Sequence, residues 1–151
     1  MSYYNLLYHV IFRTKYSIPA IDITWEKELY TYIWGFIKNK GSKLYRIGGM
    51  PDHLHILMEA AAKIALADFI RDLKTSSAKW LKGNSHFPLF QGWGVGYAVF
   101  TYAEKDKDMI VRYIMGQKEH HTRQNFDEEL QSLLIANGWK VGDEYPLKDD
   151  D

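Results

Sequence analysis

Two histidines on either side of a leucine, His53 and His55, are the residues of this sequence best suited to chemistry. They open the apolar run 53–58 (HLHILM), whose length and composition are typical of a β-strand. Side chains two positions apart on a strand point to the same face, so the two imidazoles should share one face of a sheet. Neutral imidazole nitrogens are common ligands of divalent metals, and the pair therefore predicts part of a metal site.

A tyrosine and a glutamine about sixty residues later complete the pattern. Tyr113 and Gln117 are spaced i, i+4 in the run 109–118 (MIVRYIMGQK), which favours a helix, so they should share a helical face. An amide oxygen beside two imidazoles would hold a divalent cation without cancelling its charge, and that cation would polarise a phosphate oxygen strongly. The chemistry indicated is metal-assisted phosphoryl transfer to a tyrosine.

Two other classes of function fit the same residues. A metal hydrolase or phosphoesterase that works by general acid and base would use the two histidines and would not need Tyr113. A non-catalytic ferredoxin-like module could bind nucleic acid by stacking bases on its sheet, although residues 49–55 (GMPDHLH) lack the basic and aromatic signature of the usual RNA-binding strand. Each histidine, the tyrosine and the glutamine could also have a purely structural role.

The pattern of apolar residues predicts an α+β fold. Residues 3–14, 43–50, 53–59 and 95–102 are typical of strands, and Pro51-Asp52 is typical of a tight turn between the second and third. Helices are expected over 24–40 with Thr24 as the cap, over 61–82, from Asp106 through Tyr113, and over 126–137. This order predicts the ferredoxin-like β-α-β-β-α-β arrangement, an antiparallel sheet with helices on one face, followed by C-terminal helices.

Length and composition predict a single domain over residues 1–147, followed by a disordered acidic tail over 148–151. Of the 151 residues, 46% are hydrophobic and none is cysteine, and no apolar run approaches the roughly 20 residues that cross a bilayer. We therefore expect a cytoplasmic protein without a membrane partner.

A net charge of zero conceals an uneven distribution. Residues 126–151 hold eight acidic and two basic side chains, which leaves a net charge of +6 on residues 1–125. A basic body suits a polyanionic partner, although solvated basic faces are also common in proteins. Arg13, Lys74 and Lys79 are candidates for contacts with DNA phosphates.

Two segments together resemble a known family. Residues 49–57 (GMPDHLHIL) resemble the HUH motif of the single-tyrosine transposases, the small enzymes of minimal insertion sequences, and residues 111–121 (VRYIMGQKEHH) resemble their nucleophile helix. Residues 90–100 resemble the segment that joins the two. The resemblance implies that Tyr113 is the nucleophile and that His53, His55 and Gln117 bind Mg²⁺ or Mn²⁺.

The resemblance also implies a reaction and an assembly. Members of this family cut and rejoin single-stranded or hairpin DNA through a 5′-phosphotyrosine, and they need no nucleotide cofactor because that ester retains the energy of the broken bond. Some relatives instead process the hairpins of repeated extragenic palindromes (REP), so a domesticated repeat-hairpin nuclease is the alternative. Members are usually homodimers, and the first strand, apolar on both faces at 10–12, suggests an edge strand that pairs with its own copy.

Overall fold

A computed structural model describes residues 1–140 of the chain. Within these residues four strands form a single antiparallel sheet: β1 (Leu7–Arg13), β2 (Lys43–Met50), β3 (His53–Glu59) and β4 (Ala98–Tyr102). The same part of the chain holds five α-helices: α1 (Glu26–Asn39), α2 (Leu66–Lys82), α3 (Lys107–Met115), α4 (Gln117–His120) and α5 (Phe126–Ala136). Short 3₁₀ turns lie at η1 (Lys15–Ser17) and η2 (Glu104–Asp106).

The strand order is β2-β3-β1-β4, and every neighbouring pair is antiparallel. This order and the sequence of elements confirm the predicted ferredoxin-like α+β fold. The prediction that β1 lies at an edge is wrong, because β1 pairs with β3 on one side and with β4 on the other. Strand β1 is apolar on both faces because helices cover both faces of the sheet, and the edge strands are β2 and β4.

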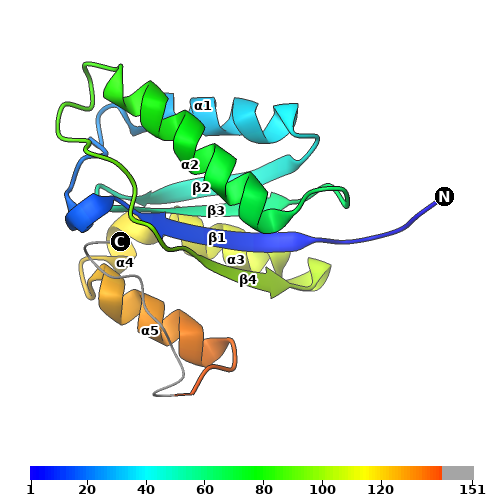
Figure 1. Ribbon diagram of the computed structural model, residues 1–151. Helices are drawn as coiled ribbons and strands as arrows, with labels where there is room; N and C mark the ends of the chain where they lie inside the picture. Colours follow the sequence, from blue (N-terminus) through cyan, green and yellow to red (C-terminus); the bar gives the residue numbers. More distant parts are fainter. Residues whose placement is uncertain (141–151) are drawn as a thin grey trace.

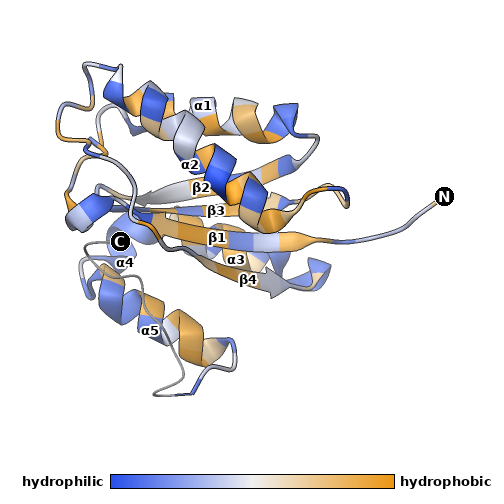
Figure 2. Cartoon of the chain, viewed as in Figure 1, coloured by the Kyte–Doolittle hydropathy of each residue, from blue (hydrophilic) through white to orange (hydrophobic). Residues whose placement is uncertain are grey.

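The helices form two layers around the sheet. Figure 1 shows α1 and α2 over one face and α3, α4 and α5 below the other. In Figure 2 the hydrophobic residues of β1 and β3 lie between these layers, and α5 carries hydrophobic residues along its length. The molecule therefore buries both faces of its central strands, as a strand that is apolar on both sides requires.

Alternation along the strands divides the apolar residues between two cores. Val10, Phe12, Leu54, Ile56 and Met58 face α1 and α2 and belong to the larger cluster. The residues between them face the other helices, where Leu7 and Leu57 pack against α3 and Ile11 packs against α5, with partners Ile110, Ile114, Leu130 and Leu134. His53, His55 and His9 have the alternate register too, so they face the second layer.

Glycine sets how closely strand β2 approaches its neighbours. A Cβ atom on Gly49 would lie 2.2 Å from the carbonyl oxygen of His53, and one on Gly48 would lie 3.0 Å from the Ile114 side chain of α3. The tight β2–β3 hairpin fixes the start of β3 at His53, where the sequence predicted it. The packing of α3 on β2 then brings the third helix close to the histidine end of the sheet.

Several boundaries differ from the predicted ones. Helix α1 begins at Glu26, and its N-cap residue Trp25 makes no side-chain cap bond, so Thr24 is not the cap. The run that was predicted as one helix through residues 113 and 117 breaks at Gly116, which ends α3 and precedes α4. Helix α5 begins with a capping box in which Asn125 and Glu128 exchange hydrogen bonds between side chain and backbone.

Strand β4 begins at residue 98 and not at residue 95 as predicted, because the backbone before it is hydrogen-bonded to a side chain of α2 and not to a neighbouring strand. Lys74 donates hydrogen bonds to the carbonyl oxygens of Gly94 at 2.5 Å, Val95 at 3.0 Å and Gly96 at 2.9 Å.

Within residues 1–140, no helix combines the length and the apolar character needed to cross a membrane. The predicted tail, 148–151, lies outside the described residues.

Candidate active site

Strand β3 places both histidines in the interior of the molecule. His53 and His55 are fully buried, because α3, α4 and α5 cover the face of the sheet from which they project (Figure 1). The shared orientation of the two imidazoles is as predicted, with ring centroids 5.2 Å apart.

Tyr113 and Gln117 reach the same place from α3 and α4. The Gln117 side chain is 1% exposed, and its Oε1 atom lies 3.2 Å from Nε2 of His53. The Tyr113 ring is edge-on to the ring of His55, with centroids 5.7 Å apart. The break at Gly116 therefore does not separate the two residues, and the structure brings together all four side chains that the sequence singled out.

Glu129 of α5, which the sequence analysis missed, lies at the centre of this group. Its Oε1 atom is 3.2 Å from Nε2 of both His53 and His55, and 2.8 Å from Nε2 of His121. Its Oε2 atom accepts hydrogen bonds from the Tyr113 hydroxyl and, at 2.7 Å, from Nε2 of Gln117. The side chain is fully buried, so this carboxylate joins the strand to all three helices of the second layer.

The sequence did contain a signal for Glu129. Phe126, Leu130 and Leu134 form the buried stripe of α5, and position 129 falls within that stripe at helical spacing. A charged residue in a core-facing stripe is rarely buried without partners. The partners come from β3, α3 and α4, which only the tertiary structure assembles.

The site shifts the pKa values of its groups in opposite directions. Burial alone would raise the pKa of Glu129, but hydrogen bonds from His53 and His55 outweigh burial and hold it well below its usual value. Burial lowers the pKa of His55 to about 4. Burial acts in the same direction on His53, but hydrogen bonds to Asp52 and Glu129 outweigh it and raise the His53 pKa. Burial, reinforced by the Glu129 charge, raises the pKa of the Tyr113 phenol. A neutral His55 and a protonated Tyr113 therefore face an ionised Glu129.

Each histidine of β3 also has a partner on its second ring nitrogen. Nδ1 of His53 lies 2.8 Å from Oδ1 of Asp52, the residue before it. Nδ1 of His55 lies 2.8 Å from Nε2 of His9, a fully buried residue of β1. In metalloproteins such contacts orient the imidazole and fix which nitrogen carries the proton.

The donor atoms fit a divalent cation. Among the described residues, one ligand atom each from His53, His55 and Glu129 lie within 4.8 Å of one another. Two imidazole nitrogens and one or two oxygens form a mixed set, and the oxygen of Gln117 is adjacent to it. Imidazole suits transition metals and carboxylate suits Mg²⁺ and Mn²⁺, so Mn²⁺ matches both halves of this set.

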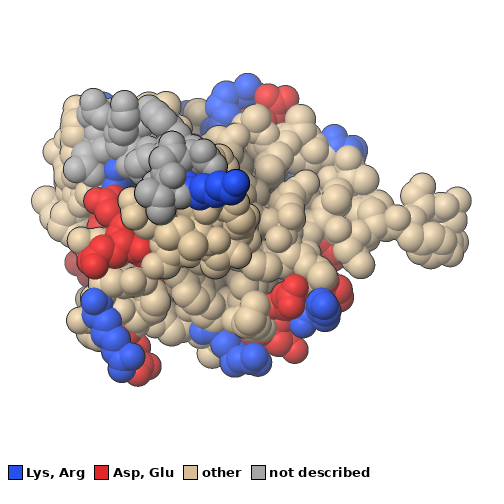
Figure 3. All heavy atoms as spheres, turned by 90° about the horizontal axis from the view of Figure 1, so that it is seen from below, with Lys and Arg blue, Asp and Glu red and all other residues tan. Residues whose placement is uncertain are grey.

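The three predicted DNA-contacting residues occupy different environments. Arg13 is 3% exposed and donates to Oδ1 of Asp127 at 3.0 Å, so in this arrangement its side chain does not face solvent. Lys74 lies on α2 and is half-buried against the loop before β4, and burial lowers its pKa to about 8. Lys79 is exposed on α2. Figure 3 shows basic and acidic side chains interspersed around the rim of the face seen from below, with no continuous basic band.

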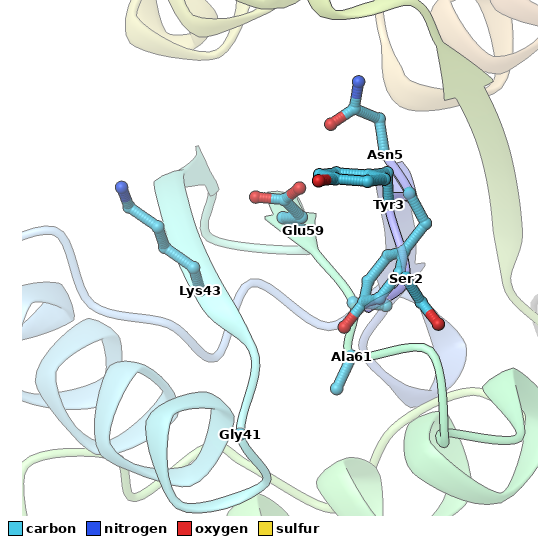
Figure 4. Close-up of a pocket in the computed structure, with 9 residues that line it drawn as sticks. Ser2, Tyr3, Asn5, Gly41, Lys43, Glu59 and Ala61 are labelled. Carbon is cyan, nitrogen blue, oxygen red and sulfur yellow. The ribbon is translucent and has the colours of Figure 1, made fainter.

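A hollow lies at the end of the sheet opposite the histidines. It has a volume of about 690 Å³ and is lined by the N-terminal segment around Tyr3 and by Lys43 and Glu59, which pair across β2 and β3 (Figure 4). Glu59 is the last residue of β3 and His53 is the first, a separation of about 20 Å along a strand. This hollow is therefore separate from the histidine site.

The fold and the buried histidine, tyrosine and carboxylate group agree with a family match. Residues 2–117 match the family described as "Transposase IS200 like", and the chain belongs to that family. The match ends at Gln117, so Glu129 lies beyond the matched segment. The predicted membership among the single-tyrosine transposases is thereby confirmed.

Individual relatives agree with this assignment. The chain is 27% identical over 121 residues to the ISDra2 transposase TnpA of Deinococcus radiodurans, a match that covers 77% of this chain and 86% of that protein. It is similar to the crystal structure of a candidate transposase from Deinococcus radiodurans, with 28% identity, a TM-score of 0.56, and coverage of 77% and 93% of the two chains. A REP-associated tyrosine transposase bound to a REP hairpin shares the fold, with a TM-score of 0.61, 14% identity, and coverage of 100% and 94%.

Proposed function

We propose that this transposase cleaves and rejoins single-stranded DNA through a 5′-phosphotyrosine on Tyr113, with a divalent cation at His53 and His55. The observation that carries the proposal is the convergence of Tyr113, Gln117 and both histidines on one buried point, where their contacts all meet Glu129. A hydrolase that activates water would have no use for a phenol in that position. A module that only binds nucleic acid would have no use for two buried imidazoles.

The reaction exchanges one ester for another. The phenolic oxygen of Tyr113 attacks the phosphorus, the bond from phosphorus to the 3′-oxygen breaks, and the products are a 5′-phosphotyrosine and a 3′-hydroxyl. Because the phenol is protonated at neutral pH, its proton must leave as the new bond forms. Oε2 of Glu129 already accepts that hydrogen bond and so orients the hydroxyl. Its lowered pKa makes it a poor base that does not keep the proton, which passes in net to the departing 3′-oxygen and gives the 3′-hydroxyl.

The cation has a definite place in this proposal. His53 and His55 would hold it with the oxygen of Gln117, and the carboxylate of Glu129 is a further ligand in reach. When bound, Mg²⁺ or Mn²⁺ supplies Lewis-acid stabilisation of the charge that develops on the phosphate. Asp52 would hold the His53 ring so that its Nε2 atom faces the site.

One matched pair of tyrosine variants and one double histidine variant test the chemistry. Tyr113→Phe removes only the hydroxyl and should abolish cleavage and the covalent adduct while the protein still folds and binds Mn²⁺. Tyr102→Phe is the matched control, since its hydroxyl contacts Asn137 at 3.4 Å and lies outside the proposed chemistry, and it should cleave like the wild type. Cleavage by Tyr113→Phe at the wild-type rate would refute the nucleophile. Calorimetry in which the double His53→Ala, His55→Ala variant binds Mn²⁺ as the wild type does would refute the metal site.

The proposed substrate is single-stranded or hairpin DNA. The +6 charge of residues 1–125 supports a polyanion, and the REP hairpin bound by a protein of the same fold supports a folded single strand. Lys79 is the exposed candidate for a phosphate contact, whereas Arg13 and Lys74 would need to leave their present partners. Affinity should fall steeply as salt rises, and a perfect duplex of equal length should bind more weakly. Equal affinity for the duplex across the titration would point to a general polyanion surface.

We further propose a homodimer, on the family resemblance and on the two open sheet edges. Since β1 is central, any pairing between sheets must use β2 or β4. Light scattering should return twice the 17.7 kDa mass of one chain, and a monomer mass at high concentration would contradict the dimer. Cleavage restricted to repeat hairpins would favour the alternative, a domesticated repeat-hairpin nuclease.

A further inference from the structure

His9 is a buried polar residue that the proposed reaction does not use. It belongs to the row of β1 that faces the second helical layer, between Leu7 and Ile11, and it is fully buried. Its ring is surrounded by aromatic side chains, with centroid distances of 6.4 Å to Phe100, 6.3 Å to Tyr102 and 6.1 Å to Tyr113. An imidazole in such surroundings loses its hydration and regains little from apolar neighbours.

Only one ring nitrogen of His9 has a hydrogen-bond partner among residues 1–140. Nε2 lies 2.8 Å from Nδ1 of His55, whereas Nδ1 has no hydrogen-bond partner among residues 1–140. Two neutral imidazoles in contact share a single proton along the line between them, so the tautomer of one ring decides the tautomer of the other. The position of the proton on His55 is therefore set together with that on His9. Without a cation, the ionised Glu129 carboxylate 3.2 Å from Nε2 of His55 favours the proton on Nε2.

The proton of His55 can lie on Nδ1 or on Nε2, and metal binding through Nε2 requires it on Nδ1. A histidine that binds a cation through Nε2 must present a lone pair there and carry its proton on Nδ1. For His53 the acceptor of that Nδ1 proton is the Asp52 carboxylate, which cannot donate when it is ionised. For His55 the only side chain at hydrogen-bond distance from Nδ1, among the described residues, is His9.

We propose that His9 is a positioning residue of the metal site, which accepts the Nδ1 proton of His55 when Nε2 of His55 exchanges its hydrogen bond to Glu129 for a divalent cation. The inference rests on the proposed function, because it assumes that His55 is a metal ligand. It gives a function to a histidine that is buried against a ligand and that the proposed reaction does not use. In the metal-bound arrangement Nδ1 of His9 carries the ring's own proton, for which residues 1–140 offer no acceptor.

Two substitutions separate a hydrogen-bonding role from a packing role. His9→Phe keeps an aromatic ring and removes the acceptor, so Mn²⁺ affinity measured by calorimetry at pH 7.5 should fall about 10–100-fold. His9→Gln places an amide oxygen near the position of Nε2 and should retain affinity to within about threefold. His55→Ala is measured in parallel, with folding of every variant checked by circular dichroism.

The outcomes distinguish this inference from the proposed function. If His55→Ala binds Mn²⁺ as well as the wild type, the metal site itself is refuted. If His55→Ala loses binding but His9→Phe does not, the role of His9 is overturned and the metal site stands. Equal loss in His9→Phe and His9→Gln would indicate packing alone and would also overturn it.

A spectroscopic measurement tests the tautomer directly. Nitrogen-15 NMR of the wild type saturated with Mg²⁺ should show the His55 proton on Nδ1 and the His9 proton also on Nδ1. A His55 proton on Nε2 in the Mg²⁺-saturated protein would overturn the inference. In His9→Gln the amide oxygen replaces Nε2 of His9 as the acceptor. Nitrogen-15 NMR that still shows the His55 proton on Nδ1 in this variant would support the inference.

Discussion

The burial of a neutral His55 should make the stability of the protein depend on pH. Burial lowers the pKa of His55 to about 4, and an unfolded histidine titrates near 6.5. Between these values the unfolded chain binds more protons at this residue than the folded chain does. Stability from this group is therefore complete above about pH 6.5 and is lost as the pH falls towards 4.

The size of the effect follows from the two pKa values. Between pH 7 and pH 5, linkage through His55 alone removes about 2 kcal/mol from the free energy of unfolding. Other groups oppose or reinforce it, since the His53 pKa is raised and the His9 pKa is lowered, chiefly by burial. A comparison with His55→Gln isolates the contribution, because that variant lacks the titrating group and keeps a polar side chain.

The assay is urea denaturation of the wild type and His55→Gln at pH 7 and pH 5, with EDTA present so that metal binding does not contribute. The wild type should lose about 2 kcal/mol more than the variant between the two pH values. Equal losses in the two proteins, or a larger loss in His55→Gln, would refute the conclusion that a buried neutral imidazole is linked to folding here.

Two matched pairs of substitutions test the packing that positions the site. Gly49→Ala should destabilise the protein by about 1–3 kcal/mol, because its Cβ would lie 2.2 Å from the His53 carbonyl oxygen, whereas Gly35→Ala in open space on α1 should stabilise it by about 0.5–1 kcal/mol. If thermal denaturation showed that both substitutions change the stability in the same direction, the described hairpin would be contradicted. Leu130→Ala should cost about 2–5 kcal/mol and Ile135→Ala less than about 0.5 kcal/mol, since Leu130 is 2% and Ile135 57% exposed. Similar losses in chemical denaturation would mean that α5 does not pack as described.

Local sequence patterns predicted the parts of the fold that depend on local physics. Strands β2 and β3 have the predicted bounds, because a turn sequence and alternating apolar residues define both arms of a hairpin. The same-face arrangement of His53 and His55 also follows from alternation alone. The break at Gly116 was not predicted, since glycine is tolerated within many helices, yet Gln117 still reaches His53.

The remaining features depend on contacts between distant segments. Glu129 joins the site because α5 packs under the sheet, and His9 joins it because β1 lies between β3 and β4. Strand order and helix placement also decided burial, which is why the histidine face is covered and Arg13 is enclosed. Two acidic residues of α5 have partners in the fold. Asp127 forms an ion pair with Arg13, and Glu129 contacts the histidines of the site.

The central claim is that Tyr113 becomes covalently joined to DNA. The most direct measurement is tandem mass spectrometry of the peptide that carries the adduct, after incubation with single-stranded DNA and Mn²⁺ and digestion of protein and DNA. A 5′-nucleotide attached to Tyr113, absent from the Tyr113→Phe variant, is the predicted result. An adduct on another tyrosine such as Tyr97 or Tyr102, or cleaved DNA without any protein adduct, would contradict the account.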